Sequence, residues 1–281
     1  MRKFMVVAAA AVASLAMVVS GCGSSSSKST SGSSTAAANL GLKTPGTLLV
    51  GSDYPYKPFE FTQGGKVTGF DYDLVTAVAA TFGVTDVKFQ QERFDTIFTS
   101  TAQGRFDMAA SSITITPERA KTVAFSAPYF EANQSIMVRA NDAKGLDALN
   151  GATITPQVAD SKLKGMSLGV QRGTTGADLA KTVPGGNVNS FQLVDDAFNA
   201  LAAKRVDAVV NDYAISQYAT KAHSELKVVA KVSPSENYGF AFPKKNTALL
   251  AAFNAGLTKI KANGTYAQIY KKWFNEAPPT N

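Results

Sequence analysis

The sequence GRFDMAASS, residues 104–112, has a counterpart later in the chain in KRVDAVVND, residues 204–212. Both segments run from a helix end through Arg, an apolar residue and Asp into an apolar strand, and both finish in polar residues. The matching charged residues are Arg105 with Arg205 and Asp107 with Asp207. Chance is the alternative interpretation, because helix-to-strand turns often hold such residues. We interpret the match as an internal repeat, which indicates two similar α/β lobes.

Short β-rich runs alternate with helical patterns around both copies of the repeat. Around the first copy, the expected strands are 47–52, 87–91 and 106–111, and the expected helices are 69–83 and 94–104. Around the second, the expected strands are 167–171, 188–194 and 206–212, and the expected helices are 173–183 and 195–204. This alternation predicts α/β units with largely parallel strand pairing.

Polar residues follow the predicted strands at their carboxyl ends, where ligands sit in open α/β sheets. They are Asp53, Ser111 with Ser112, Gln171 to Thr175, and Asn211 with Asp212. A lone aspartate at such a place is usually a helix cap or a solvated residue. Several strand ends that face one another across a cleft predict instead a polar pocket between the two lobes.

The first residues have the pattern of an export signal, with a basic start, an apolar middle and small residues at the end. Residues 1–21 are therefore expected to be removed. Cys22, the only cysteine, is placed as in a bacterial lipobox, where it becomes the lipidated first residue; the alternative is a buried cysteine in a core strand. Residues 22–44 include a Ser/Gly-rich stretch that behaves as a flexible tether. The mature protein is expected to be extracytoplasmic and anchored to the membrane.

Composition argues against several other functions. The formal charge is +7, but the basic residues are scattered, whereas nucleic-acid binding needs a concentrated stripe. The only histidine, His223, lies in the polar stretch KAHSE, where a surface position is the preferred interpretation, so we expect no metal site. The sequence has no phosphate-binding loop and no serine-nucleophile elbow. We therefore expect no cofactor and no catalytic residue.

Several segments together resemble the amino-acid-binding solute receptors of bacterial ABC importers. These segments are DYPYKPFEF, VTGFDYDLVTAVA, SSITITPERAKTVAFSAPY, GTTG, RVDAVVND and NGTYAQIYKKWF. The resemblance covers about residues 46–276 and implies a two-lobed periplasmic-binding-protein fold of type II with two hinge strands. The first lobe would comprise 45–128 with 239–277, and the second 129–238, with hinge strands near 129–133 and 234–238.

The resemblance also implies a binding site for the two charges of an α-amino acid. Arg119 matches the carboxylate-binding arginine, and its planar fork can donate two parallel hydrogen bonds. Backbone amides at Thr114 and near Thr175 would add donors, while Asp212 and Ser112 would accept from the ammonium group. The alternative for Arg119 is a surface salt bridge after Pro117 and Glu118.

Three further positions match residues that contact the ligand's side chain in the family. Tyr56 and Phe94 would hold it between two rings, although either ring alone is more often part of a core. Asp53 would contact its distal end and would repel glutamate or aspartate. Gln171 departs from each family pattern. The expected ligand is therefore glutamine or a basic amino acid.

The resemblance implies a receptor that acts as a monomer, binds its ligand between the lobes and delivers it to an ABC permease in the membrane. Cyclohexadienyl dehydratases, which act on prephenate or arogenate, and sensor domains share the fold and are the alternatives. A dehydratase needs a general acid, for which Glu92 and Glu236 are the residues to check. A sensor would need a transmembrane and an output segment, and the sequence up to Asn281 contains neither.

Overall fold

The computed structural model describes residues 40–279. The expected signal peptide, the lipidation site at Cys22 and the tether up to residue 39 lie outside these residues. Among the described residues, no helix is both long and apolar enough to cross a bilayer.

The first sheet has five strands in the order β4–β1–β5–β13–β6. Their bounds are β1 Thr47–Ser52, β4 Asp86–Gln91, β5 Met108–Ala109, β6 Ala124–Phe125 and β13 Ala241–Phe242. β1 pairs in parallel with β4 and β5, while β13 pairs antiparallel with β5 and β6. A separate hairpin joins β2, Phe61–Gln63, to β3, Lys66–Thr68. β5 is shorter than the predicted strand, which began at residue 106.

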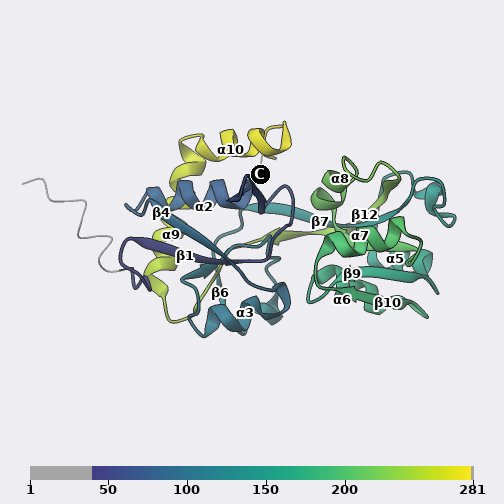
Figure 1. Ribbon diagram of the computed structural model, residues 1–281, viewed down its shortest axis with the longest axis horizontal. Helices are drawn as coiled ribbons and strands as arrows, with labels where there is room; N and C mark the ends of the chain where they lie inside the picture. Colours follow the sequence, from purple (N-terminus) through teal and green to yellow (C-terminus); the bar gives the residue numbers. More distant parts are fainter. Residues whose placement is uncertain (1–39, 280–281) are drawn as a thin grey trace, which may run out of the picture. The chain divides into compact units, whose positions relative to one another are not determined.

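The second sheet has six strands in the order β10–β9–β11–β7–β12–β8. Their bounds are β7 Phe130–Arg139, β8 Ala152–Ile154, β9 Ser167–Gln171, β10 Asn187–Phe191, β11 Ala208–Asp212 and β12 Leu226–Tyr238. β9 pairs in parallel with β10 and β11, whereas β7 pairs antiparallel with β11 and β12. Figure 1 shows β7 and β12 side by side as the long strands of this sheet. The expectation of largely parallel pairing is thus correct for β4–β1–β5 and β10–β9–β11, and β8 also pairs in parallel with β12. The antiparallel pairs of these two sheets involve β7 and β13, which lie outside the strands predicted around the repeat.

Helices connect the strands of both sheets. The helices that accompany the first sheet are α2 Phe70–Ala80, α3 Phe94–Ala102, α4 Pro117–Ala120, α9 Thr247–Ala262 and α10 Thr265–Phe274. Those that accompany the second sheet are α5 Pro156–Leu163, α6 Thr175–Thr182, α7 Val194–Ala202 and α8 Tyr213–Ala219, with a 3₁₀ turn at Leu146–Leu149. The helices predicted around both copies of the repeat are confirmed, with ends that differ by a few residues because hydrogen bonding at helix ends frays.

The internal repeat is visible in the hydrogen bonds of its two aspartates. The Asp107 amide donates to the Leu49 carbonyl (2.9 Å), and the Leu49 amide donates to Asp107 Oδ2 (2.8 Å). The Asp207 amide likewise donates to the Ser167 carbonyl (2.7 Å), and the Ser167 amide donates to Asp207 Oδ2 (3.0 Å). Each aspartate therefore joins the start of its strand to the neighbouring parallel strand, β1 or β9.

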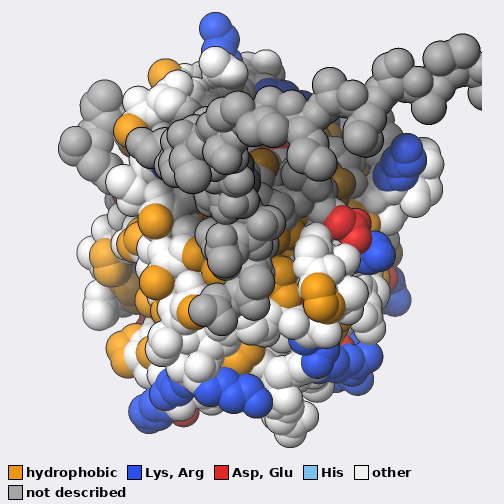
Figure 2. Space-filling view, turned by 90° about the vertical axis from the view of Figure 1, so that its left-hand side faces the viewer, with side chains coloured by type: hydrophobic (Ala, Val, Ile, Leu, Met, Phe, Trp, Pro, Cys, Tyr) orange, Lys and Arg blue, Asp and Glu red, His pale blue; other side chains and the backbone are white. Residues whose placement is uncertain are grey.

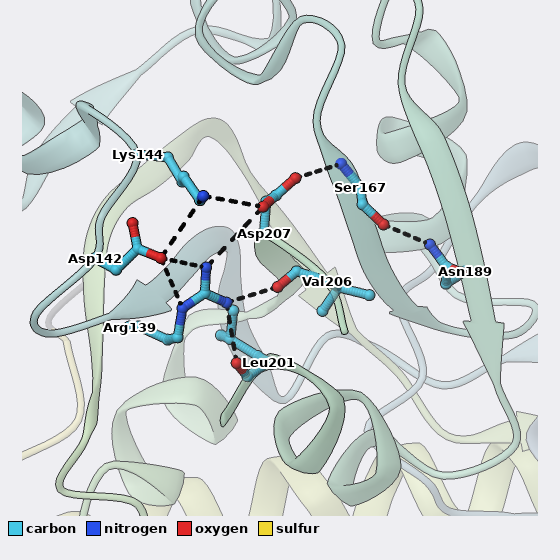
Figure 3. A network of polar contacts seen from close by, with 8 residues as sticks. All are labelled: Arg139, Asp142, Lys144, Ser167, Asn189, Leu201, Val206 and Asp207. Atoms are coloured by element: carbon cyan, nitrogen blue, oxygen red, sulfur yellow. Dashed lines mark hydrogen bonds and ion pairs between the residues drawn. The ribbon is translucent and has the colours of Figure 1, made fainter. Parts of the chain in front are cut away.

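Asp207 also belongs to a polar network at the end of β7 (Figure 3). The buried Arg139 donates through Nη1 to the carbonyls of Leu201 (3.0 Å) and Val206 (2.7 Å). Its Nη2 lies 2.9 Å from Asp142 Oδ2 and 4.0 Å from Asp207 Oδ1. This guanidinium satisfies carbonyls at the end of α7 and before β11, and so connects the hinge strand β7 to the second copy of the repeat.

Aromatic side chains anchor the adjoining ends of β7 and β12 in the core beside the first sheet. Tyr129, just before β7, stacks on Phe240, just after β12, with ring centroids 4.1 Å apart and planes at 8°. Phe130 contacts the buried Phe59 edge to face at 4.9 Å and stacks on Tyr238 at 5.6 Å. Because these rings are nearly fully buried, they fix the points from which the two strands leave this core.

Figure 2 shows one face of the molecule by side-chain type. Its Lys and Arg side chains occur in separate groups, with hydrophobic and uncharged atoms between them. The described residues of this face therefore carry no continuous basic stripe.

Candidate functional site

One narrow cavity brings together all ten residues that the sequence predicted to bind a ligand. They are Asp53, Tyr56, Phe94, Ser111, Ser112, Thr114, Arg119, Gln171, Thr175 and Asp212, and Thr174 joins them in the lining. The first seven lie in α3, in α4 or in the loops that follow β1 and β5 of the first sheet. The others follow β9 and β11, so the cavity lies at the carboxyl ends of strands from both sheets.

Asp53, directly after β1, is held by donors from both lobes. Its Oδ2 accepts from the Gln171 amide (2.8 Å) and the Phe94 backbone amide (3.1 Å), and its Oδ1 accepts from Gln91 (3.2 Å). Burial raises the pKa of Asp53 to about 6, although the bonds from Phe94 and Gln171 oppose this shift. Gln171, the last residue of β9, also donates to the Gln192 carbonyl just after β10 (3.2 Å). Its amide therefore links the end of the second sheet to Asp53, the expected selectivity position.

Asp212, at the end of β11, accepts three hydrogen bonds from side chains. Oδ2 accepts from Tyr56 (2.8 Å) and Tyr238 (2.6 Å), and Oδ1 accepts from the Gln134 amide. Burial, and next the charge of Glu236, raise the pKa of Asp212 to about 6, while the three hydrogen bonds lower it. Tyr56 therefore contributes its hydroxyl across the lobes as well as the ring that the sequence predicted.

Arg119 lies in the short helix α4, which Thr116 caps by accepting from the Arg119 amide (3.1 Å). The guanidinium donates to the carbonyls of Thr114 (2.7 Å) and Gly173 (3.0 Å). Its centre lies 5.2 Å from the ring centroid of Phe94 and 4.9 Å from that of Phe98. The Phe94 ring thus supports the arginine by a cation–π contact, and burial lowers the pKa of Arg119.

Ser111 and Ser112 connect the cavity to two carboxyl groups that are completely buried. Ser111 Oγ accepts from the Asp53 amide (3.0 Å), and both serine hydroxyls lie within 3.5 Å of Glu60. Asp71 accepts from the Ser112 amide (3.1 Å) and from the Tyr129 hydroxyl (2.8 Å). Burial, and next the charge of Asp71, raise the pKa of Glu60 well above its ordinary value. Burial also raises the pKa of Asp71, to about 7.

Glu236 of the hinge strand β12 joins the two threonines of the cavity. Its Oε2 accepts from Thr114 Oγ1 and Thr175 Oγ1, both at 2.8 Å, and from Gln134 Nε2 at 3.3 Å. Glu92, the other glutamate considered, pairs with Arg105 at 3.0 Å and does not line the cavity.

Sequence reasoning gave no binding role to Gln134, Glu236 or Tyr238. All three lie on β7 or β12, and these crossing strands carry no turn or helix-start motif that would mark them as part of a site. Gln134 of β7 pairs antiparallel with Asp212 of β11 on one side and with Val232 of β12 on the other. Only this pairing of distant strands brings the three side chains to Asp212 and the cavity.

The side chains of the cavity can bind a ligand that carries both a positive and a negative charge. The cavity contains one guanidinium, carboxylates at two positions that share no hydrogen-bond donor, several hydroxyls and two aromatic rings. Among residues 40–279, no group of three or more His, Cys, Asp or Glu side chains could hold a metal ion. The arrangement suits a small polar ligand that carries both signs of charge.

The chain belongs to the bacterial extracellular solute-binding proteins, family 3, whose sequence pattern matches residues 48–276. It is 31% identical over 230 residues to the probable histidine-binding protein of Campylobacter jejuni subsp. jejuni serotype O:2, with 81% of this chain and 84% of that one covered.

Two solved structures have the same two-lobed periplasmic-binding-protein fold. A mutant of ArgBP from T. maritima is 37% identical with a TM-score of 0.74, and the match covers 82% of this chain and 96% of that one. ArtJ, the arginine-, lysine-, histidine-binding protein of Geobacillus stearothermophilus, is 34% identical with a TM-score of 0.72, over 83% and 96% of the two chains. These relatives are named as binding proteins, which identifies the chain as a solute-binding protein and not an enzyme.

Proposed function

We propose that the chain is an extracytoplasmic receptor that binds a polar amino acid, glutamine or a basic amino acid, in the cavity between its lobes. The observation that carries the proposal is the presence of Arg119 and Asp212 in one cavity with Asp53. The names of the relatives, which refer to histidine, arginine and lysine, support the same class of ligand.

The zwitterion of an α-amino acid has a partner for each of its charges. The guanidinium of Arg119 can donate two parallel hydrogen bonds to the α-carboxylate, in exchange for the carbonyls of Thr114 and Gly173. Asp212 can accept from the α-ammonium group, with the hydroxyl of Ser112 as a neutral acceptor. Asp212 is buried and Arg119 is half-buried, so a charge between them is screened less than on the surface.

The distal end of the ligand would meet Asp53. A carboxylate here accepts from the amide of glutamine or from the cation of a basic side chain, and it repels the carboxylate of glutamate. Gln171 donates to the same oxygen and would yield part of this contact to the ligand. Tyr56 and Phe94 would cover the aliphatic part of the side chain.

We further propose that residues 45–128 with 239–277 form one lobe and residues 129–238 the other. The strands of the first sheet fall within the first set, and those of the second sheet fall within 129–238. Ligand binding would then close the lobes by rotation about β7 and β12. The closed monomer, anchored by a lipid on Cys22, would deliver the amino acid to an ABC permease.

Isothermal titration of the purified protein with the twenty amino acids tests the proposal. We expect saturable binding of one molecule of glutamine or of a basic amino acid, and much weaker binding of glutamate and aspartate. The absence of binding by any amino acid would contradict the proposal, and turnover of prephenate or arogenate by the same samples would favour the dehydratase alternative.

A further inference from the structure

Glu236 lies at the centre of a set of contacts that the proposed zwitterion site does not require. One carboxylate oxygen, Oε2, accepts hydrogen bonds from Thr114 of the first lobe, Thr175 of the second lobe and Gln134 of the other hinge strand. These contacts hold the carboxylate beside residues that line the cavity. Its negative charge is therefore fixed next to the ligand site.

The position of Gln134 shows that Glu236 and Asp212 lie close together. The same amide nitrogen of Gln134 donates to Asp212 Oδ1 and to Glu236 Oε2. The negative charge of Glu236 also raises the pKa of Arg119, by less than the charge of Asp212 does, and so opposes the effect of burial. Two carboxylates thus flank the one guanidinium at this part of the cavity.

Two further acidic groups that affect the site are paired locally, whereas Glu60 and Asp71, behind Ser111 and Ser112, hold their protons more tightly because burial raises their pKa. Asp178, whose charge also raises the pKa of Arg119, pairs with Lys181 at 2.8 Å. Asp95, whose charge raises the pKa of Asp53, pairs with Arg93 at 2.7 Å.

The remaining charges of the site do not balance. Asp53, Asp212 and Glu236 supply three negative charges, and Arg119 supplies one positive charge. Glu236 does not itself line the cavity but hydrogen-bonds to two threonines that do, and these four groups together carry a net charge of −2, or −1 without Glu236. Glutamine, whose net charge is zero, would leave this excess unchanged, whereas arginine or lysine would reduce it by one unit. Asp53 and Asp212 are buried and Glu236 is half-buried, and an uncompensated charge among them is unfavourable, so the site favours the cationic ligand.

We propose that Glu236 is a further specificity-determining residue of the cavity, and that its charge directs the site to arginine and lysine rather than to glutamine. This inference rests on the proposed function, because it concerns the class of ligand bound in the same cavity.

The test compares a charged ligand with a neutral ligand of the same shape. L-arginine and L-citrulline differ in that citrulline carries a neutral urea group in place of the guanidinium, and both have the same zwitterion. Glu236→Gln removes the charge and retains an oxygen that can accept from Thr114 and Thr175. Glu131→Gln is the matched control, because Glu131 is exposed on the neighbouring hinge strand and does not line the cavity.

Calorimetric titration should show that the wild-type protein binds L-arginine more tightly than L-citrulline or L-glutamine. In Glu236→Gln, the ratio of arginine affinity to citrulline affinity should fall on the order of tenfold, as expected for loss of one charge several Å from the ligand. In Glu131→Gln the ratio should remain that of the wild type. The thermal unfolding midpoint of each ligand-free variant reports whether it is folded.

Three results would overturn the inference. An unchanged ratio in Glu236→Gln, or an equal loss for both ligands, would show that Glu236 only holds the lobes together. A wild-type protein that prefers glutamine or citrulline to arginine would refute it even if the variant failed to fold. Binding of no amino acid by the wild type would instead contradict the proposed function itself.

Discussion

Replacing Asp53 with Asn should change the side-chain preference of the receptor more than its general affinity. Two unit charges about 4 Å apart interact by about 4 kcal/mol at an effective dielectric constant near 20. Asp53 already accepts from Gln91, Phe94 and Gln171, and a ligand would replace only part of these bonds. We therefore expect the variant to lose about 2 kcal/mol, or roughly 30-fold, in affinity for arginine.

The effect depends on the charge state of Asp53. Its pKa is raised by burial to about 6, so roughly nine in ten molecules carry the charge at pH 7. Glutamate should gain affinity in Asp53→Asn because the repulsion is removed, and glutamine should change little because asparagine retains an amide oxygen that can accept. The gap between basic and acidic ligands should therefore narrow.

Titration of the wild type and Asp53→Asn with arginine, glutamine and glutamate measures these differences. Asp86→Asn, at the exposed start of β4, is the control for a lost carboxylate outside the cavity. An equal shift for all three ligands, or a wild-type preference for glutamate, would refute the assignment of Asp53 as the selector.

Three other predictions concern the zwitterion site, the anchor and the buried carboxyl groups. Arg119→Ala or Asp212→Ala should weaken every amino acid together, by about 2–5 kcal/mol, because the partner charge stays buried and unpaired; near-normal titration of either variant would refute the site. Cys22→Ser should release the protein from membranes or leave its precursor unprocessed, and normal processing with membrane retention, seen on fractionation, would contradict lipidation. The pKa of Glu60 is raised above its ordinary value of 4.5 by burial and then by Asp71, so the folded state holds this proton more tightly than the unfolded state. Its contribution to stability is present below pH 4.5 and is lost as the pH rises through the folded value. In denaturant titrations, the unfolding free energy of Glu60→Gln should thus fall less than that of the wild type between pH 5 and 8, and equal slopes would exclude this role.

The sequence predicted most of what local physical chemistry determines. The repeat around Asp107 and Asp207 indicated two related lobes, and both aspartates make the same pair of bonds to the neighbouring parallel strand. Strand ends were predicted to supply a polar pocket, because parallel strands end at one edge of a sheet. Asp53 and Asp212 follow such strands and line the cavity.

Contacts that depend on pairing between distant segments could not be predicted in this way. Gln134 and Glu236 lie more than a hundred residues apart, and their hydrogen bond exists because β7 and β12 pair antiparallel. Likewise, nothing near Tyr56 in the sequence indicates that its hydroxyl bonds to Asp212. The burial of Glu60 beside Asp71 also depends on how α2 packs beneath Ser112.

The central claim is that Arg119 and Asp212 recognise the zwitterion of an amino acid, and deletion of one charge from the ligand tests it most directly. Agmatine has the guanidinium, the carbon chain and the amino group of arginine but lacks its α-carboxylate. Calorimetric titration should show binding of one L-arginine per protein molecule and at least a hundredfold weaker binding of agmatine, on the order of 3 kcal/mol. Equal affinity for the two compounds would contradict the account, because the carboxylate would then have no partner in the cavity.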